Sequence, residues 1–414
     1  MTPEVKKRIE QIRQGIVPEG YKKGKIGIVP IKWNEVPFST LFTSTSEYTD
    51  DLKQYPLYSL TIEDGITAKT ERYERSHLVK KENSYKVVRP NDYAYNPMNI
   101  RFGAVARHKG DIPVAVSGYY DIFTTVHESD LVFMDSFLTY GPMITYYNKV
   151  STGSLVEKQR VHFSDFLEFS LALPPLEERK KIAEILSTQD KAIELQGRKI
   201  EELKRFKKGC LEKMFPRKGQ KVPEKRFPGF TDDWEQRKFE EIAVRSSVIC
   251  SDDTLPRVEY EDIVSGTGRL NKDIYTKESS KSGIAFHQGD VLYGKLRPYL
   301  QNWLLPAFDG LAVGDFWVLQ PQNADSSFLY RLIQSRQFDE VANQSTGTKM
   351  PRADWKLVSK TVFSIPSNIS EQAAIGTYFT ALDNLITLHQ RKLEEMKNQK
   401  KALMQLLLTG IVRV

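Results

Sequence analysis

The sequence predicts an α+β protein with two mixed, mostly β domains that are separated by two long helices. Two observations predict this fold class. Residues 176–213 recur as residues 369–406 at a shift of 193 positions, with 12 identities among 38 aligned residues and no gap. Outside these segments, short β-branched and aromatic runs alternate with Gly, Pro, Asn and Asp, which is the pattern of short strands joined by turns.

Length and composition narrow the class of protein. A chain of 414 residues is long enough for roughly two to four domains, and 40% apolar residues can fill their cores. The two cysteines, Cys210 and Cys250, exclude a disulfide framework and a cysteine-built zinc site. The start of the chain lacks the apolar core of a secretory signal, and no apolar run is long enough to cross a membrane. We therefore expect a soluble cytoplasmic protein.

The basic excess of the chain lies mainly in one stretch. Residues 173–225 hold 15 Lys and Arg against 9 Asp and Glu, whereas residues 25–172 and 226–364 each carry a net charge of −2. A solvated helix surface explains such an excess, and so does affinity for a polyanion. If the two large segments bind nucleic acid, each needs a basic face that is balanced by an acidic one.

Each copy of the repeat predicts one long helix. Prolines precede both copies and disfavour helix in the residue before them, and Asn368 and Ser370 are candidate N-caps of the second helix. Apolar residues recur at three- and four-residue spacing, which predicts an antiparallel coiled coil; the alternative is two amphipathic helices packed on separate domains. The candidate residues for the coiled coil or for partner binding are Ile182, Ile193, Ile200, Leu203, Ile375, Leu382, Ile386, Leu393 and Met396.

The N-terminus carries a partial third copy of the helix end. Gly15-Ile16-Val17 matches Gly410-Ile411-Val412, which predicts a circular repeat with pseudo-twofold symmetry and neighbouring termini. A helix of about 40 residues spans roughly 60 Å, so the helix pair would space the domains like a ruler. The predicted order is a helical segment at 1–24, a domain at 25–172, a long helix at 173–216, a linker at 217–229, a second domain at 230–364 and a long helix at 365–414.

Short anchors recur in the two domains, although the sequence between them differs widely. This predicts one scaffold that carries two different binding surfaces. Within the domains, helices are expected at Val132–Val150 and Phe328–Phe338. The paired anchors are Lys32-Trp33 with Asp233-Trp234, Asp92–Tyr95 with Asp290–Tyr293, and Ser151–Ser154 with Ser345–Thr348.

Enzyme motifs are weak in this chain. The phosphate-binding loop of ATPases and the dinucleotide fingerprint are missing, and the six histidines have no ligand spacing. Tyr95-Asn96-Pro97-Met98 is close to the motif with which adenine methyltransferases hold a flipped base, but it lacks the second proline and the aromatic residue. Asp290 and Lys295 lack the second carboxylate of a nuclease site. We therefore predict no catalytic, cofactor-binding or metal-binding residue.

A nucleic-acid surface is the remaining candidate. Lys, Arg, Asn, Gln and Thr side chains can contact phosphates and base edges, and several clusters of them occur in both domains. An ordinary solvated role is as good an interpretation of each one. The candidate DNA-binding residues are Lys69, Arg72, Arg75, Asn96, Asn99, Arg101, Arg107 and Lys109 in the first domain, and Arg269, Lys272, Lys295, Arg297, Asn302, Thr348, Lys349 and Arg352 in the second.

Together these features resemble the specificity subunit of type I restriction-modification systems. The resemblance covers nearly the whole chain, and the first domain departs from it most, at Asn91–Tyr95. It rests on the order of four motifs, which are Leu173-Pro174-Pro175-Leu176-Glu177-Glu178, Ile365-Pro366 with Ser370-Glu371-Gln372-Ala373, Phe227-Pro228-Gly229-Phe230-Thr231-Asp232-Asp233-Trp234, and Gly289-Asp290-Val291-Leu292-Tyr293 with Ser345-Thr346-Gly347-Thr348.

The resemblance implies a non-catalytic DNA-binding subunit with a role in DNA methylation and phage defence. Its two target-recognition domains would each read one half of a bipartite double-stranded target. Two methyltransferase subunits that carry S-adenosylmethionine would bind the long helices, and motor-nuclease subunits that use ATP and Mg²⁺ would join them. Two alternatives are a self-contained adenine methyltransferase or nuclease, and a structural coiled-coil protein with no DNA role.

Overall fold

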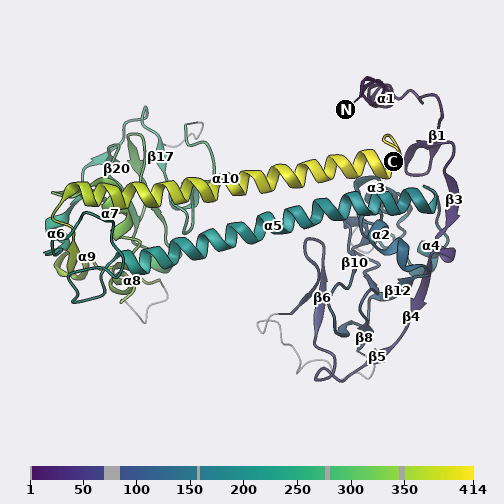
Figure 1. The fold of residues 1–414 in the computed structure, drawn as a ribbon, viewed down its shortest axis with the longest axis horizontal. Coiled ribbons are helices and arrows are strands. Elements are labelled where there is room, and N and C mark those ends of the chain that lie inside the picture. Colours follow the sequence, from purple (N-terminus) through teal and green to yellow (C-terminus); the bar gives the residue numbers. More distant parts are fainter. Residues whose placement is uncertain (1, 70–83, 156–158, 276–279, 345–349) are drawn as a thin grey trace. The chain divides into compact units, whose positions relative to one another are not determined.

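The chain folds into two compact units, each with one strand-rich domain and a part of both long helices (Figure 1). A computed structural model describes residues 2–69, 84–155, 159–275, 280–344 and 350–414. The first unit comprises residues 1–195 and 393–414, and the second comprises residues 196–392. Mixed helix and strand content is therefore confirmed.

The first unit is built on two small antiparallel sheets. One has the strand order β4-β12-β9-β10 and the other has the order β5-β8-β11. Three antiparallel pairs complete it, β1 with β2, β6 with β7 and β3 with β13. The strands are β1 (Tyr21–Gly24), β2 (Gly27–Pro30), β3 (Asn34–Pro37), β4 (Phe42–Thr45), β5 (Tyr48–Thr49), β6 (Tyr58–Thr61), β7 (Gly65–Ala68), β8 (Tyr85–Val88), β9 (Tyr93–Tyr95), β10 (Val105–Arg107), β11 (Val114–Ser117), β12 (Asp121–Thr125) and β13 (Ser170–Leu173). The short helices are α1 (Pro3–Arg13), α2 (Leu131–Phe137), α3 (Gly141–Val150) and α4 (Phe163–Leu167).

The second unit has a closely similar strand arrangement. Its sheets have the orders β15-β24-β21-β22 and β16-β20-β23-β17, and its strand pairs are β14 with β25 and β18 with β19. The strands are β14 (Glu235–Lys238), β15 (Ala243–Ser246), β16 (Ile249–Cys250), β17 (Arg257–Val258), β18 (Ile263–Val264), β19 (Arg269–Leu270), β20 (Gly283–Phe286), β21 (Val291–Gly294), β22 (Trp303–Leu304), β23 (Gly310–Ala312), β24 (Phe316–Pro321) and β25 (Val362–Ile365). The short helices are α6 (Phe239–Ile242), α7 (Ser326–Leu332), α8 (Arg336–Ala342) and α9 (Trp355–Lys360).

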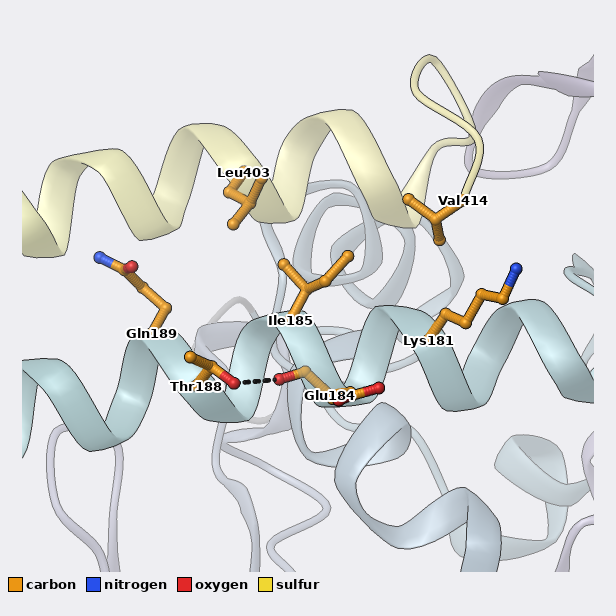
Figure 2. A pocket seen from close by; sticks show the side chains of 7 residues that line it. All are labelled: Lys181, Glu184, Ile185, Thr188, Gln189, Leu403 and Val414. Carbon is orange, nitrogen blue, oxygen red and sulfur yellow. Dashed lines mark hydrogen bonds between the residues drawn. The ribbon is translucent and has the colours of Figure 1, made fainter.

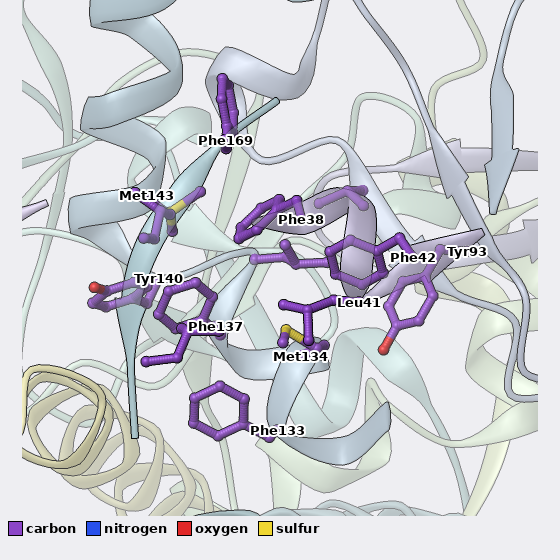
Figure 3. Close-up of a cluster of buried hydrophobic side chains, with 14 of the residues drawn as sticks. Phe38, Leu41, Phe42, Tyr93, Phe133, Met134, Phe137, Tyr140, Met143 and Phe169 are labelled. Atoms are coloured by element: carbon purple, nitrogen blue, oxygen red, sulfur yellow. The ribbon is translucent and has the colours of Figure 1, made fainter. Parts of the chain in front are cut away.

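Aromatic side chains fill the main core of each domain. In the first domain, Phe38 and Phe42 meet edge to face with ring centroids 5.3 Å apart (Figure 3). Alternation along β9 explains how one strand serves two cores, because Tyr93 and Tyr95 enter this cluster while Ala94 faces a second one. In the second domain, Trp234, Trp317 and Phe338 belong to the corresponding main core.

The two long helices are α5 (Leu176–Met214) and α10 (Ile369–Leu408). The Asn368 side chain accepts a hydrogen bond from the Ser370 backbone N–H at 2.8 Å, so Asn368 caps α10 and Ser370 lies inside its first turn. The contacts between the helices have an antiparallel order, because a residue earlier in α5 pairs with a residue later in α10. The Lys400 ammonium lies 2.5 Å from the Asp190 carboxylate, and the Lys207 ammonium lies 2.6 Å from that of Asp383.

The nine candidate residues of the helix pair all turn away from solvent. Ile182, Ile200, Leu203, Ile375, Leu382 and Ile386 are buried, and Ile193, Leu393 and Met396 are half-buried. In the second unit, the Gln196 side-chain amide donates to the His389 carbonyl at 2.8 Å and lies 2.9 Å from its ring Nδ1. In the first unit, the corresponding amide of Gln189 donates to the Met396 carbonyl at 3.3 Å.

Three expected elements differ in their bounds. The predicted helix 132–150 is two helices, because Pro142 is tolerated only in the first turn of a helix and therefore marks the start of α3. The predicted helix 328–338 is also two, since the Ser335 hydroxyl accepts a hydrogen bond from the Phe338 backbone N–H and starts α8. The segment 1–24 is helical only over Pro3–Arg13, and its end forms strand β1.

Gly410 ends α10 and brings the last residues of the chain against the first ones. Its φ of +69° suits glycine, and a Cβ there would lie 2.5 Å from Pro30 Cγ and 2.8 Å from the Trp33 ring. The Tyr21 hydroxyl donates to the Gly410 carbonyl at 2.7 Å, and the Arg8 guanidinium donates to the Ile411 carbonyl. The N-terminal segment and the chain end are thus neighbours, as predicted from the Gly-Ile-Val match.

The fit at Gly410 gives a testable prediction. Gly410→Ala should lower the free energy of unfolding by about 2–4 kcal/mol, because strained backbone and overpacking add. Gly15→Ala is the matched control, since Gly15 has φ +75° but no atom within 4 Å of a Cβ. It should cost about 1 kcal/mol. Urea unfolding of both variants measures the difference, and equal losses would show that the predicted clash at Gly410 does not exist.

Candidate nucleic-acid interface

The start of each long helix is fixed by a buried glutamate that binds one tryptophan and one arginine. In the first unit, Glu178 accepts a hydrogen bond from the Trp33 indole at 3.2 Å and from the Arg413 guanidinium at 2.7 Å. Trp33 begins the first domain, Glu178 lies in the first turn of α5, and Arg413 follows α10. This cluster therefore ties one domain and both long helices together.

The second unit repeats this arrangement with the same three residue types at other positions of the chain. Glu371, in the first turn of α10, accepts from the Trp234 indole at 3.2 Å and from the Arg226 guanidinium at 2.6 and 2.7 Å. Arg226 follows α5, just as Arg413 follows α10. We call each cluster a Trp–Glu–Arg joint. The glutamate is 6% exposed in the first joint and 1% exposed in the second.

Each arginine offsets the cost of burying a glutamate. A buried carboxylate is costly unless charged and neutral donors satisfy it. The hydrogen bond that Arg226 donates to Glu371 is the main reason why the pKa of Arg226 is raised, and the one that Arg413 donates to Glu178 has the same effect on the pKa of Arg413. Neither arginine was among the candidate residues, because each lies outside the repeat in an irregular segment. The aligned glutamates and tryptophans were the signal that could have led to them.

The candidate residues of the first domain fall into buried and exposed groups. Asn96 is buried, and its side-chain oxygen accepts hydrogen bonds from the backbone of Met98 and Asn99, so it shapes a turn. Arg107 binds Asp135 at 2.8 Å and is largely buried. Desolvation opposes the charge of Arg107, but the bonds to Asp135 outweigh it and its pKa is raised. These two side chains serve the fold.

The remaining candidates of the first domain are more accessible. Lys109 is 67% exposed, although its ammonium lies 3.3 Å from Asp135. Lys69 and Asn99 are exposed, and Arg101 is half-buried and donates to the Gln159 side chain at 3.1 Å. Arg72 and Arg75 lie outside the described residues.

In the second domain, three basic candidate residues lie close together in the structure. Lys295 and Arg352 lie 3.5 and 3.1 Å from the carboxylate of Asp315, and the Arg297 backbone N–H donates to the Pro351 carbonyl at 2.7 Å. Arg352 is more than 50 residues away from Lys295 and Arg297 in the sequence. These three residues form what we call the basic edge.

The loop that carries Arg297 is strained. Arg297 and Gln301 have φ values of +49° and +56°, which non-glycine residues rarely adopt. They flank a single turn at Pro298–Leu300, in which Tyr299 is 57% exposed. Strained backbone of this kind is common at binding sites, where it fixes the direction of a side chain.

The other candidates of the second domain are spread out. Asn302 is buried below this loop, and Lys272 pairs with Asp262 at 2.7 Å. Arg269 is exposed on β19 and donates to the Gln390 side chain at 3.3 Å. Thr348 and Lys349 lie outside the described residues.

Comparison with known proteins places the chain in a family. A family model described as the type I restriction modification DNA specificity domain matches residues 136–205 and 232–398, which is more than half of the chain. The chain belongs to this family. The predicted resemblance to type I specificity subunits is thereby confirmed.

Curated relatives within the specificity-domain family are distant in sequence. The chain is 26% identical over 273 residues to the type I restriction enzyme MjaVIII specificity subunit of Methanocaldococcus jannaschii, covering 60% of this chain and 63% of that protein, just under two thirds of its length. It is 23% identical over 448 residues to the putative type I restriction enzyme MjaX specificity subunit of the same organism, covering 99% and 93%.

Two solved structures share the fold of this family member. A chain from a structure on complex assembly and conformational transition of the type I R-M system matches with a TM-score of 0.58, 15% identity and coverage of 93% and 99%. The type I restriction-modification system S subunit from M. genitalium matches with a TM-score of 0.54, 12% identity and coverage of 94% and 99%.

The first unit contains a cleft between its two long-helix segments. A cleft of about 610 Å³ lies between α5 and the end of α10, where Ile185 and Leu403 point toward each other and Lys181 and Val414 lie at one end (Figure 2). Within the described ranges, no group of three or more His, Cys, Asp or Glu side chains could hold a metal ion. Among the same residues, no helix is long and apolar enough to cross a membrane.

The joints give a second prediction. Arg226→Met should lower the free energy of unfolding by roughly 3–5 kcal/mol, because the buried Glu371 loses its charged partner. Arg89→Met is the control, since the Arg89–Glu47 pair is exposed and its loss should hardly change the free energy of unfolding. Urea unfolding measures both values. A loss for Arg226→Met no larger than the control would rule out the joint as a stabilising contact.

Proposed function

We propose that this chain is the DNA-specificity subunit of a type I restriction-modification complex and reads a bipartite double-stranded target. The observation that carries the proposal is the presence of two domains whose main sheets have the same strand order, each joined to a long helix by the same Trp–Glu–Arg joint, in a chain of the specificity-domain family. The two target-recognition domains would be 25–172 and 230–364.

In this proposal, the two domains repeat one scaffold but carry two different DNA-binding surfaces. The main sheets β4-β12-β9-β10 and β15-β24-β21-β22 support the shared scaffold. The loops that follow the equivalent strands β9 and β21 differ: the first begins with the buried Asn96, whereas the second carries the exposed Arg297 at a positive φ. Different side chains on one scaffold would recognise two different half-sites, because base edges are read by individual hydrogen bonds.

The long helices would form an antiparallel coiled coil that sets the gap between the half-sites. Buried apolar positions along both helices and the pairs Asp190–Lys400 and Lys207–Asp383 support this pairing. At a rise of about 1.5 Å per residue, a helix of about 40 residues extends roughly 60 Å, longer than the ~34 Å of one DNA turn. The helix surfaces would also dock the methyltransferase subunits.

Catalysis would belong to the partners. We propose that methyltransferase subunits supply S-adenosylmethionine and receive the flipped adenine, and that motor-nuclease subunits use ATP and Mg²⁺. The role of this chain would be to bind DNA and to orient the target base toward a partner. A self-contained methyltransferase or nuclease and a purely structural coiled-coil protein are the alternatives, and the two unlike surfaces on one scaffold favour DNA reading over both.

The basic edge provides the test. Arg297→Gly with Arg352→Ala should weaken recognition of the second half-site by about 1–3 kcal/mol for each base pair that these side chains read. Glycine is chosen at 297 because it accepts the φ of +49°. Mapping of N6-methyladenine in host cells should then show relaxed sequence preference in one half of the motif only. The control is Arg237→Ala, which removes an arginine of β14 that pairs with Glu235 at 2.5 Å and should leave the map intact. The proposal fails for the basic edge if both halves of the motif, or neither half, change.

A further inference from the structure

The second unit contains a basic groove, and Arg269 is the candidate DNA-binding residue in its lining. It has a volume of about 730 Å³. One wall is α5, with Lys204, Lys207 and Lys208, and the opposite wall includes Thr267 and Gln301 from the second domain. We call this space the lysine groove.

The domain wall of the lysine groove is firmly held. The Gly266 backbone N–H donates to the Gln301 carbonyl at 3.0 Å, and the Ser265 hydroxyl donates to the Leu300 carbonyl. The turn between β18 and β19 therefore rests on the strained loop. Gly268, at φ +65°, is required there because a Cβ would collide with the hydroxyl of the buried Tyr330. Contacts within the protein therefore hold this wall in place without a ligand.

The charge of the groove is positive. Five of its lining side chains are Lys or Arg and three are Asp or Glu. Of the acids, Asp383 is held between Lys207 at 2.6 Å and Arg331 at 2.7 Å, so its charge is compensated inside the protein. Burial raises the pKa of Asp339. Lys208 is exposed, and so is Lys204, whose ammonium lies 2.8 Å from the exposed carboxylate of Glu201.

The lysines of the groove also recur in the second helix. Lys204, Lys207 and Lys208 align with Lys397, Lys400 and Lys401 at the repeat shift of 193 residues. Lys400 pairs with Asp190 as Lys207 pairs with Asp383, so the local setting recurs as well. A feature common to both helices cannot distinguish one half-site from the other. If these lysines contact DNA, they therefore contact a part of it that is the same at every sequence.

The spacing of the lysines fits a polyanion. Lys204 and Lys208 are four residues apart on one helix face, a rise of about 6 Å, which is close to two phosphate steps of roughly 3.4 Å each along a DNA strand. Lysine acts as a point charge and imposes no directional pattern on a base. Trp303, the aromatic residue in the lining, is buried and offers no open ring on which a nucleobase could stack.

We propose that the lysine groove binds the sugar-phosphate backbone of the DNA without reading its sequence. The inference rests on the proposed DNA-binding function. Lys204 and Lys208 contact the phosphates directly, and Lys207 is a positioning residue that holds Asp383 and shapes the floor. The groove thus contributes affinity and alignment, and the half-site contacts contribute specificity.

Salt-dependent DNA binding by the full chain tests the groove. The probe is a 30-base-pair duplex of random sequence, followed by fluorescence anisotropy over a series of salt concentrations. Lys204→Glu with Lys208→Glu should weaken binding at least tenfold and reduce the slope of log K against log salt by about 2, since two phosphates are no longer neutralised. Lys204→Gln with Lys208→Gln should give a smaller change in the same direction.

The matched control is Lys180→Glu with Lys191→Glu, which makes the same change of charge on exposed positions of α5 outside the groove. It should leave the slope unchanged. An equal change in control and groove variants, or no change in either while the wild type binds DNA, would overturn the groove and leave the proposed function standing. Absence of salt-dependent binding by the wild type would overturn both.

A second arm separates the two sources of phosphate. ATP and inorganic tripolyphosphate are titrated into the wild type and the glutamate variant without DNA. Weak or no binding of both is expected. Binding of either that is abolished by the variant, with an unchanged DNA salt slope, would assign the groove to a small polyphosphate and overturn the backbone proposal.

Discussion

The buried glutamate at the start of each long helix is the contact on which the architecture depends. Glu178 and Glu371 each bind the tryptophan that opens a domain and the arginine that follows the opposite helix. One carboxylate therefore fixes a domain, the start of one long helix and the segment that follows the other long helix. Because each glutamate is almost fully buried, neither donor can be removed without leaving an unsatisfied charge.

This joint divides the chain into constant and variable parts. The helices, the joints and the main sheets follow one plan in both units, while the loops on the sheets differ. The division suits a protein in which the fold must stay fixed while the recognised sequence changes. On this account the constant part also binds what is constant in DNA, through lysines that recur in both helices, and the loops bind what varies.

The sequence predicted the long helices and their start regions because a repeat of 38 residues with an apolar pattern is a strong local signal. It could not predict the partners of Glu178 and Glu371, since Arg413 is 235 residues from the first and Arg226 is 145 residues from the second. Local turn chemistry was also missed, as at Pro142. Among the candidate DNA contacts, residue type alone could not separate the buried Asn96 from exposed neighbours, because burial is decided by tertiary packing.

The most direct test of the central claim is a genome-wide map of N6-methyladenine in host cells with and without this chain. The account predicts the loss of one motif that has two specified halves and an unspecified gap of fixed length between them. Identical maps in cells that produce the methyltransferase partner would contradict it, and so would the loss of a motif without a gap.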